Sequence, residues 1–291
     1  MTPIEGVLPS RKHRILPDSQ AMYLPAYMPD LIEFKAGDSQ SQESGRLIYD
    51  RHGWVGSGWR RVQCRYNQPD YDLKVEDSCH FLVREGGKVI VRVRRDGDPG
   101  SVDLLDWEVL HGPALVLALS MQGIWCLHAS AVEKMGKTTL FLGDSGSGKS
   151  TLAAYLSGQA LPGWRRVADD ILPVSLVGEK LEAKTGFPQL KLSGKEQPAR
   201  QLPASLAVER IFILKQVDET ESSGVKTLAH RQTATELLRH TAGTRLFAPD
   251  LLARHLGFCG QIVGKVPVYS LAYPHTQEAL VQVKNLLEYA C

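Results

Sequence analysis

Residues 143–150, GDSGSGKS, constrain this chain more strongly than any other segment. Two glycines separated by four residues and followed by lysine and serine form the pattern of a phosphate-binding loop. Glycines let the backbone of such a loop fold so that several N–H groups point at one anion. A short β-prone run, 138–142, precedes the loop, and a helical pattern, 150–156, follows it. The sequence therefore predicts a strand, a phosphate-binding loop and a helix in succession.

The chemistry of this loop makes ATP and Mg²⁺ the expected cofactors, although the pattern itself requires only a nucleoside triphosphate. Lys149 is expected to reach the β- and γ-phosphates, and the Ser150 hydroxyl is expected to coordinate Mg²⁺. The predicted nucleotide-binding residues are those of the loop and the start of the helix: Gly143, Asp144, Ser145, Gly146, Ser147, Gly148, Lys149, Ser150 and Thr151.

The bulk composition argues against a nucleic-acid partner. The chain has 291 residues, 43% of them hydrophobic, which suits one large globular domain or two modest ones. Its formal net charge is only +2. It also has no long run of lysine and arginine with interleaved aromatic residues, which would indicate nucleic-acid binding.

Cysteine usage and the lack of targeting signals predict a cytoplasmic protein without a membrane partner. The five cysteines are odd in number, widely spaced and form no CxxC pair. They therefore indicate neither a disulfide framework nor a zinc site, and they suit a reducing compartment. The first residues lack the apolar core of a signal peptide. The longest apolar helical run, 114–119, is too short to span a bilayer.

The chain is predicted to divide into two regions. Residues 1–103 are expected to form a smaller β-rich domain with a role in substrate presentation or assembly, and residues 104–291 a larger α/β domain. Gly86 and Gly87 are typical of a hairpin turn. The early strand candidates are 46–49, 62–66, 80–83 and 88–93, separated by segments with turn chemistry that include HGWVGSGW at 52–59. The arms of the hairpin are expected at 80–84 and 88–94.

The second region alternates strand and helix patterns, so the expected fold class is α/β with an α+β front half. A helix over 104–119 should be interrupted at Gly112 and Pro113, because proline is not tolerated inside a helix. The remaining predicted elements are strands at 124–132, 138–142, 166–168, 172–176, 180–183 and 210–214 and helices at 233–239 and 276–289. The strand at 166–168 is expected to end at Asp169 and Asp170.

Two adjacent carboxylates, Asp169 and Asp170, lie about twenty residues past Lys149, far enough for one helix, one turn and one short strand. A carboxylate there can hold Mg²⁺ directly or through water. Consecutive side chains in a strand point to opposite faces, so both can share a site only where the strand ends. If they share it, one carboxylate neutralises the metal and the other accepts a proton from a substrate hydroxyl. The alternative is one functional aspartate and one solvated neighbour.

His128 is a further candidate for a catalytic role. If Val132 and Thr138 face each other at the end of a hairpin, the numbers of any two facing residues add to 270. His128 then lies opposite Leu142, at the rim of the phosphate-binding loop. An imidazole there could orient a catalytic carboxylate. The alternative is a histidine whose hydrogen bonds are satisfied in the core.

Together, LHASAVEKMGKTTLFLGDSGSGKSTLAAYL and GWRRVADDILPV resemble the HPr kinase/phosphorylase superfamily. The histidine strand, the loop and the early aspartate pair occur in the same order and at similar spacing, and the likeness covers residues 124–174. It implies a P-loop kinase core that resembles phosphoenolpyruvate carboxykinase. It also implies phosphorylation of a serine hydroxyl of a small protein.

The resemblance assigns roles to individual residues. Asp169 would be the catalytic base with His128 beside it, Ser150 and Asp170 would be the metal residues, and Lys149 would be the phosphate ligand. Asp169, His128 and Lys149 are thus the predicted catalytic residues. Members of the family are often oligomers, which leaves a homo-oligomer open.

One departure from the family pattern bears on the acceptor. The family has a glycine-rich signature with another metal-binding glutamate, whereas the corresponding stretch here, TGFPQLKLSG, contains no acidic residue. The chain looks more like the shortened homologues encoded beside peptide-biosynthesis genes, including lasso-peptide precursor kinases. The expected partner is therefore a peptide or small protein, such as a ribosomally made precursor, that carries the acceptor serine.

Two other functions stay open from the sequence: a P-loop kinase of a small metabolite, and a nucleotide-binding regulator without transfer activity. A metabolite kinase would normally add an arginine-bearing lid. The polar stretch 193–201, with Lys195 and Arg200, is a candidate for such a lid. A late arginine, Arg245, is a candidate for phosphate or substrate binding.

Overall fold

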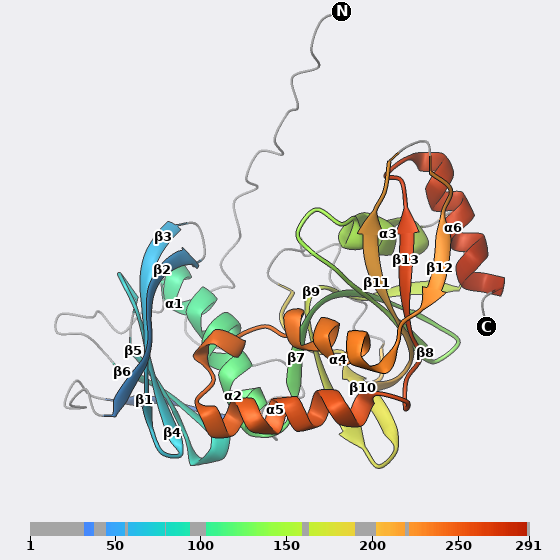
Figure 1. Ribbon diagram of the computed structural model, residues 1–291. Helices are drawn as coiled ribbons and strands as arrows, with labels where there is room; N and C mark the ends of the chain where they lie inside the picture. Colours follow the sequence, from blue (N-terminus) through green and yellow to red (C-terminus); the bar gives the residue numbers. More distant parts are fainter. Residues whose placement is uncertain are drawn as a thin grey trace, which may run out of the picture.

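The computed structural model describes residues 32–37, 45–55, 58–78, 80–93, 103–158, 163–189, 202–218 and 221–289. In this part of the chain two β-sheets lie on either side of a buried helical segment (Figure 1). The fold is mixed α/β, as the sequence predicts. The candidate lid at 193–201 lies outside the described residues.

The first sheet has six strands in the order β1-β6-β5-β4-β3-β2. All neighbours are antiparallel except β1 and β6, which are parallel. The hairpin predicted around Gly86 and Gly87 is confirmed, whereas most of 52–59, predicted as a turn, belongs to two long strands. The strands are β1 (Glu33–Gly37), β2 (Arg46–Val55), β3 (Gly58–Asn67), β4 (Asp70–Val75), β5 (His80–Arg84) and β6 (Val89–Val93).

A helical segment, Leu104–Met121, lies between the sheets and consists of α1 (Leu104–Val109), a π-helical turn and α2 (Leu115–Met121). The predicted interruption is present, because Gly112 has non-helical backbone angles and Pro113 follows it. By length and mean hydropathy, 1.3, the segment could cross a membrane, but 72% of it is buried inside the fold. A core helix has the same properties, so this feature is weak evidence for a membrane span.

The second sheet has seven strands in the order β10-β9-β7-β8-β11-β13-β12, and β10 also pairs with β11. Five of these strands, from β10 to β11 in that order, therefore close into a ring. The central strands β8, β11 and β13 are parallel to one another. The strands are β7 (Trp125–Lys134), β8 (Lys137–Leu142), β9 (Trp164–Val177), β10 (Lys180–Lys184), β11 (Ser205–Gln216), β12 (Gly224–Thr227) and β13 (Val268–Tyr273).

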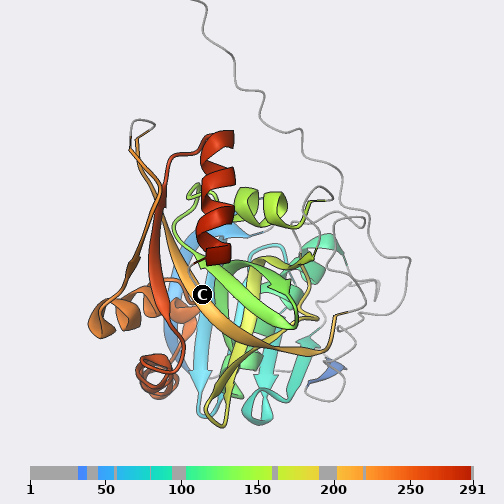
Figure 2. The same cartoon turned by 90° about the vertical axis from the view of Figure 1, so that its right-hand side faces the viewer.

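Helices pack against the second sheet in two groups (Figures 1 and 2). Helices α3 (Lys149–Leu156) and α6 (Gln277–Tyr289) share one apolar cluster with Phe141 and Phe212 of the sheet. Helices α4 (His230–Arg239) and α5 (Pro249–Ile262) contact each other. The sequence predicts α4 and α6, whereas α5 and β13 were not identified from it.

The largest apolar cluster runs through both sheets and the helical segment between them. Helix α5 extends from the second sheet toward the first (Figure 1). At its start the Tyr66 hydroxyl donates to Asp250 Oδ2 at 2.8 Å, and the Ala248 N–H donates to the Tyr71 hydroxyl at 3.0 Å. The division of the chain after residue 103 stays a prediction, and the two regions share one continuous core.

Candidate functional site

The GDSGSGKS loop joins the carboxyl end of β8 to the start of α3, so the predicted strand–loop–helix order is confirmed. Gly146 and Gly148 have left-handed backbone angles, with φ of 85° and 86°. A Cβ on Gly148 would also collide with the Tyr273 hydroxyl. Glycine is therefore required at position 148 by the backbone conformation and by the close approach of β13.

Lys149 is buried, and its ammonium group lies against the first residues of the loop. Its Nζ donates to the carbonyl oxygens of Gly143 at 2.7 Å and Asp144 at 2.9 Å. A buried ammonium group needs such acceptors to offset its desolvation. Close by, the hydroxyl of Ser147 is buried and has no hydrogen-bond partner in the described part of the chain. A ligand in the loop could satisfy this hydroxyl.

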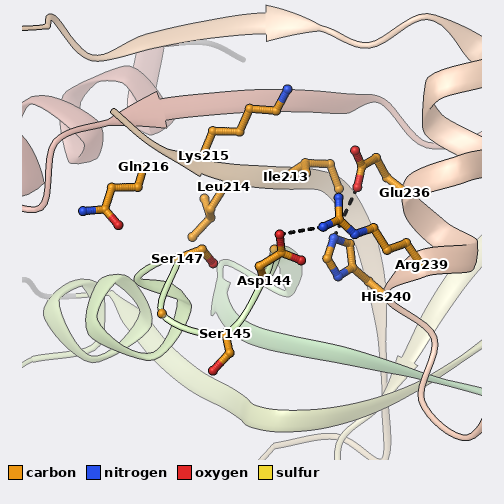
Figure 3. Close-up of a pocket in the computed structure, with 12 residues that line it drawn as sticks. Asp144, Ser145, Ser147, Ile213, Leu214, Lys215, Gln216, Glu236, Arg239 and His240 are labelled. Carbon is orange, nitrogen blue, oxygen red and sulfur yellow. Dashed lines mark hydrogen bonds and ion pairs between the residues drawn. The ribbon is translucent and has the colours of Figure 1, made fainter. Parts of the chain in front are cut away.

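A cavity of about 450 Å³ opens beside the first half of the loop (Figure 3). One wall is the loop, the second is the carboxyl end of β11, and the third is the end of α4. Because β8 and β11 are parallel, their carboxyl ends lie side by side, and the cavity lies at these two ends. The lining residues are Gly143, Asp144, Ser145, Gly146, Ser147, Ile213, Leu214, Lys215, Gln216, Glu236, Arg239 and His240.

Two contacts between polar side chains cross or line this cavity (Figure 3). The Arg239 Nη2 lies 2.7 Å from Asp144 Oδ2 and so joins α4 to the loop. The His240 Nε2 lies 3.3 Å from Glu236 Oε2. Burial lowers the pKa of His240, and the charges of Glu236 and Asp144 oppose that shift.

Strand β9 continues through the carboxylate pair, so the prediction that a strand ends there is wrong. Asp169 and Asp170 lie in the middle of a 14-residue strand, where consecutive side chains point to opposite faces. In this structure the two carboxylates accordingly lie in two separate sets of contacts.

Asp169 is 9% exposed, and its carboxylate is held at Oδ1. The Ser130 hydroxyl donates to Oδ1 at 3.0 Å, and the Arg166 Nη2 lies 2.6 Å from the same oxygen. Arg166 also donates to the carbonyl oxygen of Ser150 at 3.3 Å. One arginine therefore connects Asp169 to the first turn of α3.

The side chain of Gln189 forms hydrogen bonds with backbone groups of β9 at and beside Asp169. The Asp169 N–H donates to Gln189 Oε1 at 2.8 Å, and Gln189 Nε2 donates to the carbonyl oxygen of Ile171 at 2.9 Å. The glutamine amide thus makes the two hydrogen bonds that a neighbouring strand would make.

His128 contacts Asp170, whereas the family resemblance placed it beside Asp169. Its Nδ1 lies 3.3 Å from Asp170 Oδ1. The predicted register of the hairpin is wrong by one residue, because Ala129 rather than His128 lies opposite Leu142. The turn between β7 and β8 consists of only two residues, Met135 and Gly136. Each residue of β7 therefore faces a position one residue later in the chain than predicted. The His128 N–H donates to the carbonyl oxygen of His240 at 2.7 Å, which joins β7 to the end of α4.

The structure therefore brings the predicted residues together in two groups. Lys149 and the loop lie next to the cavity, and Asp169 connects to Ser150 through Arg166. Asp170 and His128 form the second group, which meets the end of α4 through His240. Among the described residues, no group of three or more histidine, cysteine, aspartate or glutamate side chains is arranged to hold a metal.

The residues that α4 supplies were not predicted from the sequence. Glu236, Arg239 and His240 line the cavity, and their spacing on one helix was the available signal. Arg245, the candidate arginine from the sequence, is exposed and is not among the lining residues. Arg166 was also missed, although it lies three residues before Asp169.

The fold and the site define a mixed α/β protein with a glycine-rich loop between a central strand and a helix. No family model matches the chain, and no curated protein is significantly similar to it. Among solved structures, the chain is similar to the Hpr(Ser) kinase/phosphatase from Coxiella burnetii at 14% identity and a TM-score of 0.34. The similarity covers 57% of this chain and 95% of that one.

Proposed function

We propose that this protein is an ATP- and Mg²⁺-dependent kinase that transfers the γ-phosphate to a serine hydroxyl of a peptide or small protein. The observation that carries this proposal is the position of Arg166. This arginine connects Asp169, a buried carboxylate, to the first turn of the helix that follows a phosphate-binding loop. The linkage supports a phosphate donor and a proton acceptor in one site.

The loop supplies the groups that would bind the donor. Its backbone N–H groups and Lys149 would hold the phosphates, and Lys149 would exchange the carbonyls of Gly143 and Asp144 for phosphate oxygens. The buried Ser147 hydroxyl, which has no partner among the described residues, supports a ligand at this place.

Ser150 and Asp170 are the residues proposed to hold Mg²⁺, although this structure places them in different groups of contacts, Ser150 with Asp169 through Arg166 and Asp170 with His128. They offer a hydroxyl and a carboxylate, and Mg²⁺ prefers oxygen ligands of this kind together with phosphate oxygens. When bound, the ion would neutralise charge that develops on the phosphoryl group. His128, 3.3 Å from Asp170, would orient this carboxylate.

Asp169 is proposed to accept the proton of the incoming serine hydroxyl. Within the described structure its carboxylate contacts Ser130 and Arg166, and both contacts use Oδ1. Oδ2 is therefore the oxygen that would receive the proton. Arg166 and Ser130 would hold the carboxylate in position for this transfer.

The test is a radiolabelled phosphate-transfer assay with Mg²⁺-ATP. The acceptors offered in parallel are an HPr protein, any short peptide encoded beside the gene, free serine, and a panel of sugars and nucleosides. We expect label on a peptide or protein serine. Asp169→Asn should lower the rate of transfer about 10²–10⁴-fold, because general-base catalysis contributes that much. It should leave ATP binding unchanged.

The assay also separates the alternatives. Label on a metabolite would identify a small-molecule kinase instead. ATP binding without transfer to any acceptor would favour a regulator. Full transfer by Asp169→Asn would contradict the assignment of the base. Asp170→Asn is the matched variant, because it removes the neighbouring carboxylate and should raise the Mg²⁺ concentration that transfer requires.

The first sheet is proposed to present the acceptor or to mediate assembly. The protein is proposed to act in the cytoplasm. Both proposals extend beyond the kinase assignment and do not affect the test above.

A further inference from the structure

We propose that Arg239 binds the terminal phosphate of the nucleotide and that the Asp144 carboxylate competes with this phosphate for the arginine. This inference rests on one part of the proposed function, namely that a nucleotide binds at the loop. It adds an arginine from α4 to the site. It also gives the Asp144 side chain a role that opposes binding.

Arg239 is positioned to reach a ligand in the loop. Its guanidinium group extends from the last residue of α4 across the cavity to Asp144 (Figure 3). Lys149 Nζ binds the carbonyl oxygen of the same Asp144. Two cations therefore converge on one end of the loop. Since the lysine of such loops contacts the β- and γ-phosphates, this end is where the terminal phosphate would lie.

The ion pair between Arg239 and Asp144 is exposed, because the two side chains are 57% and 64% accessible to solvent. Ion pairs this exposed contribute little to stability, so the carboxylate can be exchanged for another anion at small cost. A phosphate group offers guanidinium a bidentate partner and carries more charge than a carboxylate.

The charges that line the cavity favour the same exchange. Asp144 and Glu236 are the acidic lining residues, and of the two Asp144 belongs to the loop itself. The Asp144 carboxylate would therefore repel an incoming phosphate as long as it faces the cavity. When Asp144 leaves Arg239 and its exposed side chain turns to solvent, this repulsion decreases and the guanidinium group becomes available to the phosphate.

The test compares the affinities of the full chain for ATP and ADP in the presence of Mg²⁺, by calorimetry. We expect Arg239→Gln to weaken ATP binding by about tenfold and ADP binding by less than about threefold, because only ATP carries the terminal phosphate. We expect Asp144→Asn to tighten ATP binding by about threefold or more, since the competing carboxylate is removed. Arg239→Lys should recover part of the loss.

Arg51→Gln, which removes an exposed arginine of the first sheet, is the matched control and should change neither affinity. Thermal unfolding of each variant verifies that it is folded. Equal losses for ATP and ADP in Arg239→Gln, or weaker ATP binding in Asp144→Asn, would overturn the inference while leaving the proposed kinase intact. If the unmodified protein bound neither nucleotide, the proposed function would fail as well.

Discussion

At the scale of single residues, Gly148 is the position where the loop tolerates least change. Its φ of 86° is unfavourable for any residue with a Cβ, and such a Cβ would meet the Tyr273 hydroxyl. We expect Gly148→Ala to lower the free energy of unfolding by about 1–3 kcal/mol, because strained backbone conformations cost that much. It should also abolish ATP binding. Chemical denaturation and calorimetry check both effects.

A second variant and a control separate the two causes at Gly148. Adding Tyr273→Phe to Gly148→Ala removes the hydroxyl that the Cβ would meet and should recover part of the stability. Gly257→Ala, in α5, places its Cβ in open space and should be neutral or stabilising. A Gly148→Ala protein with normal stability and normal ATP affinity would contradict the prediction.

At the scale of elements, the turn between β7 and β8 determines the register of the strand that carries His128. Met135 and Gly136 both have positive φ, 54° and 81°, and Met135 is 89% exposed. Two-residue turns of this kind favour Asn-Gly. We expect Met135→Asn to raise the free energy of unfolding by about 0.5–1 kcal/mol, since asparagine tolerates this conformation better than methionine.

The control for this turn is Met135→Val, which should destabilise the protein, because a β-branched residue is strained at positive φ. Thermal unfolding distinguishes the two variants. A loss of stability in Met135→Asn would contradict this prediction, because it would show that the exposed methionine side chain itself stabilises the folded protein.

The same turn shows how far the sequence could predict the site. GDSGSGKS identified the loop and its flanking elements, because the conformation of the loop and its phosphate-binding groups depend on residues that are neighbours in the sequence. The two-residue length of the β7–β8 turn was not identified, because Met135 is not a residue that turn chemistry favours. The predicted register was therefore shifted by one residue. The pairing of His128 with Asp170 depends on β9 passing through both aspartates, and no local pattern revealed its 14-residue length.

Other parts of the site could not be predicted because they depend on distant segments. Arg239 meets Asp144 across 95 positions of sequence. Gln189 meets Asp169 only because the chain turns back along β9 through β10. Such contacts result from tertiary packing, and residue patterns within single elements do not predict them.

At the scale of the whole molecule, one buried histidine makes stability depend on pH. His255 in α5 is fully buried beside Trp125 and Phe247, and its Nδ1 has no partner within the described structure. Burial lowers its pKa to about 4, from 6.5. Between these two values the unfolded chain therefore takes up a proton that the folded protein does not.

Because the pKa of this group is lower in the folded state, its neutral form favours folding above pH 6.5, and that contribution is lost as the pH falls toward 4. The loss amounts to about 3 kcal/mol at the lower limit. We expect urea denaturation to show a free energy of unfolding that decreases over this range. His255→Gln should have a smaller slope, even if its stability at neutral pH is lower. Equal slopes in the two proteins would contradict the assignment to His255.

The hydrogen bonds of Gln189 restrict how an acceptor chain can approach the carboxylates. Many proteins bind extended peptides by β-strand addition, in which the peptide pairs with a free strand edge. Beside Asp169 the donor and acceptor that such a peptide would use are already bound to the glutamine amide. On the other side β9 pairs with β7. The serine of the proposed substrate would therefore reach Asp169 from a turn or a chain end that projects toward the face of the strand.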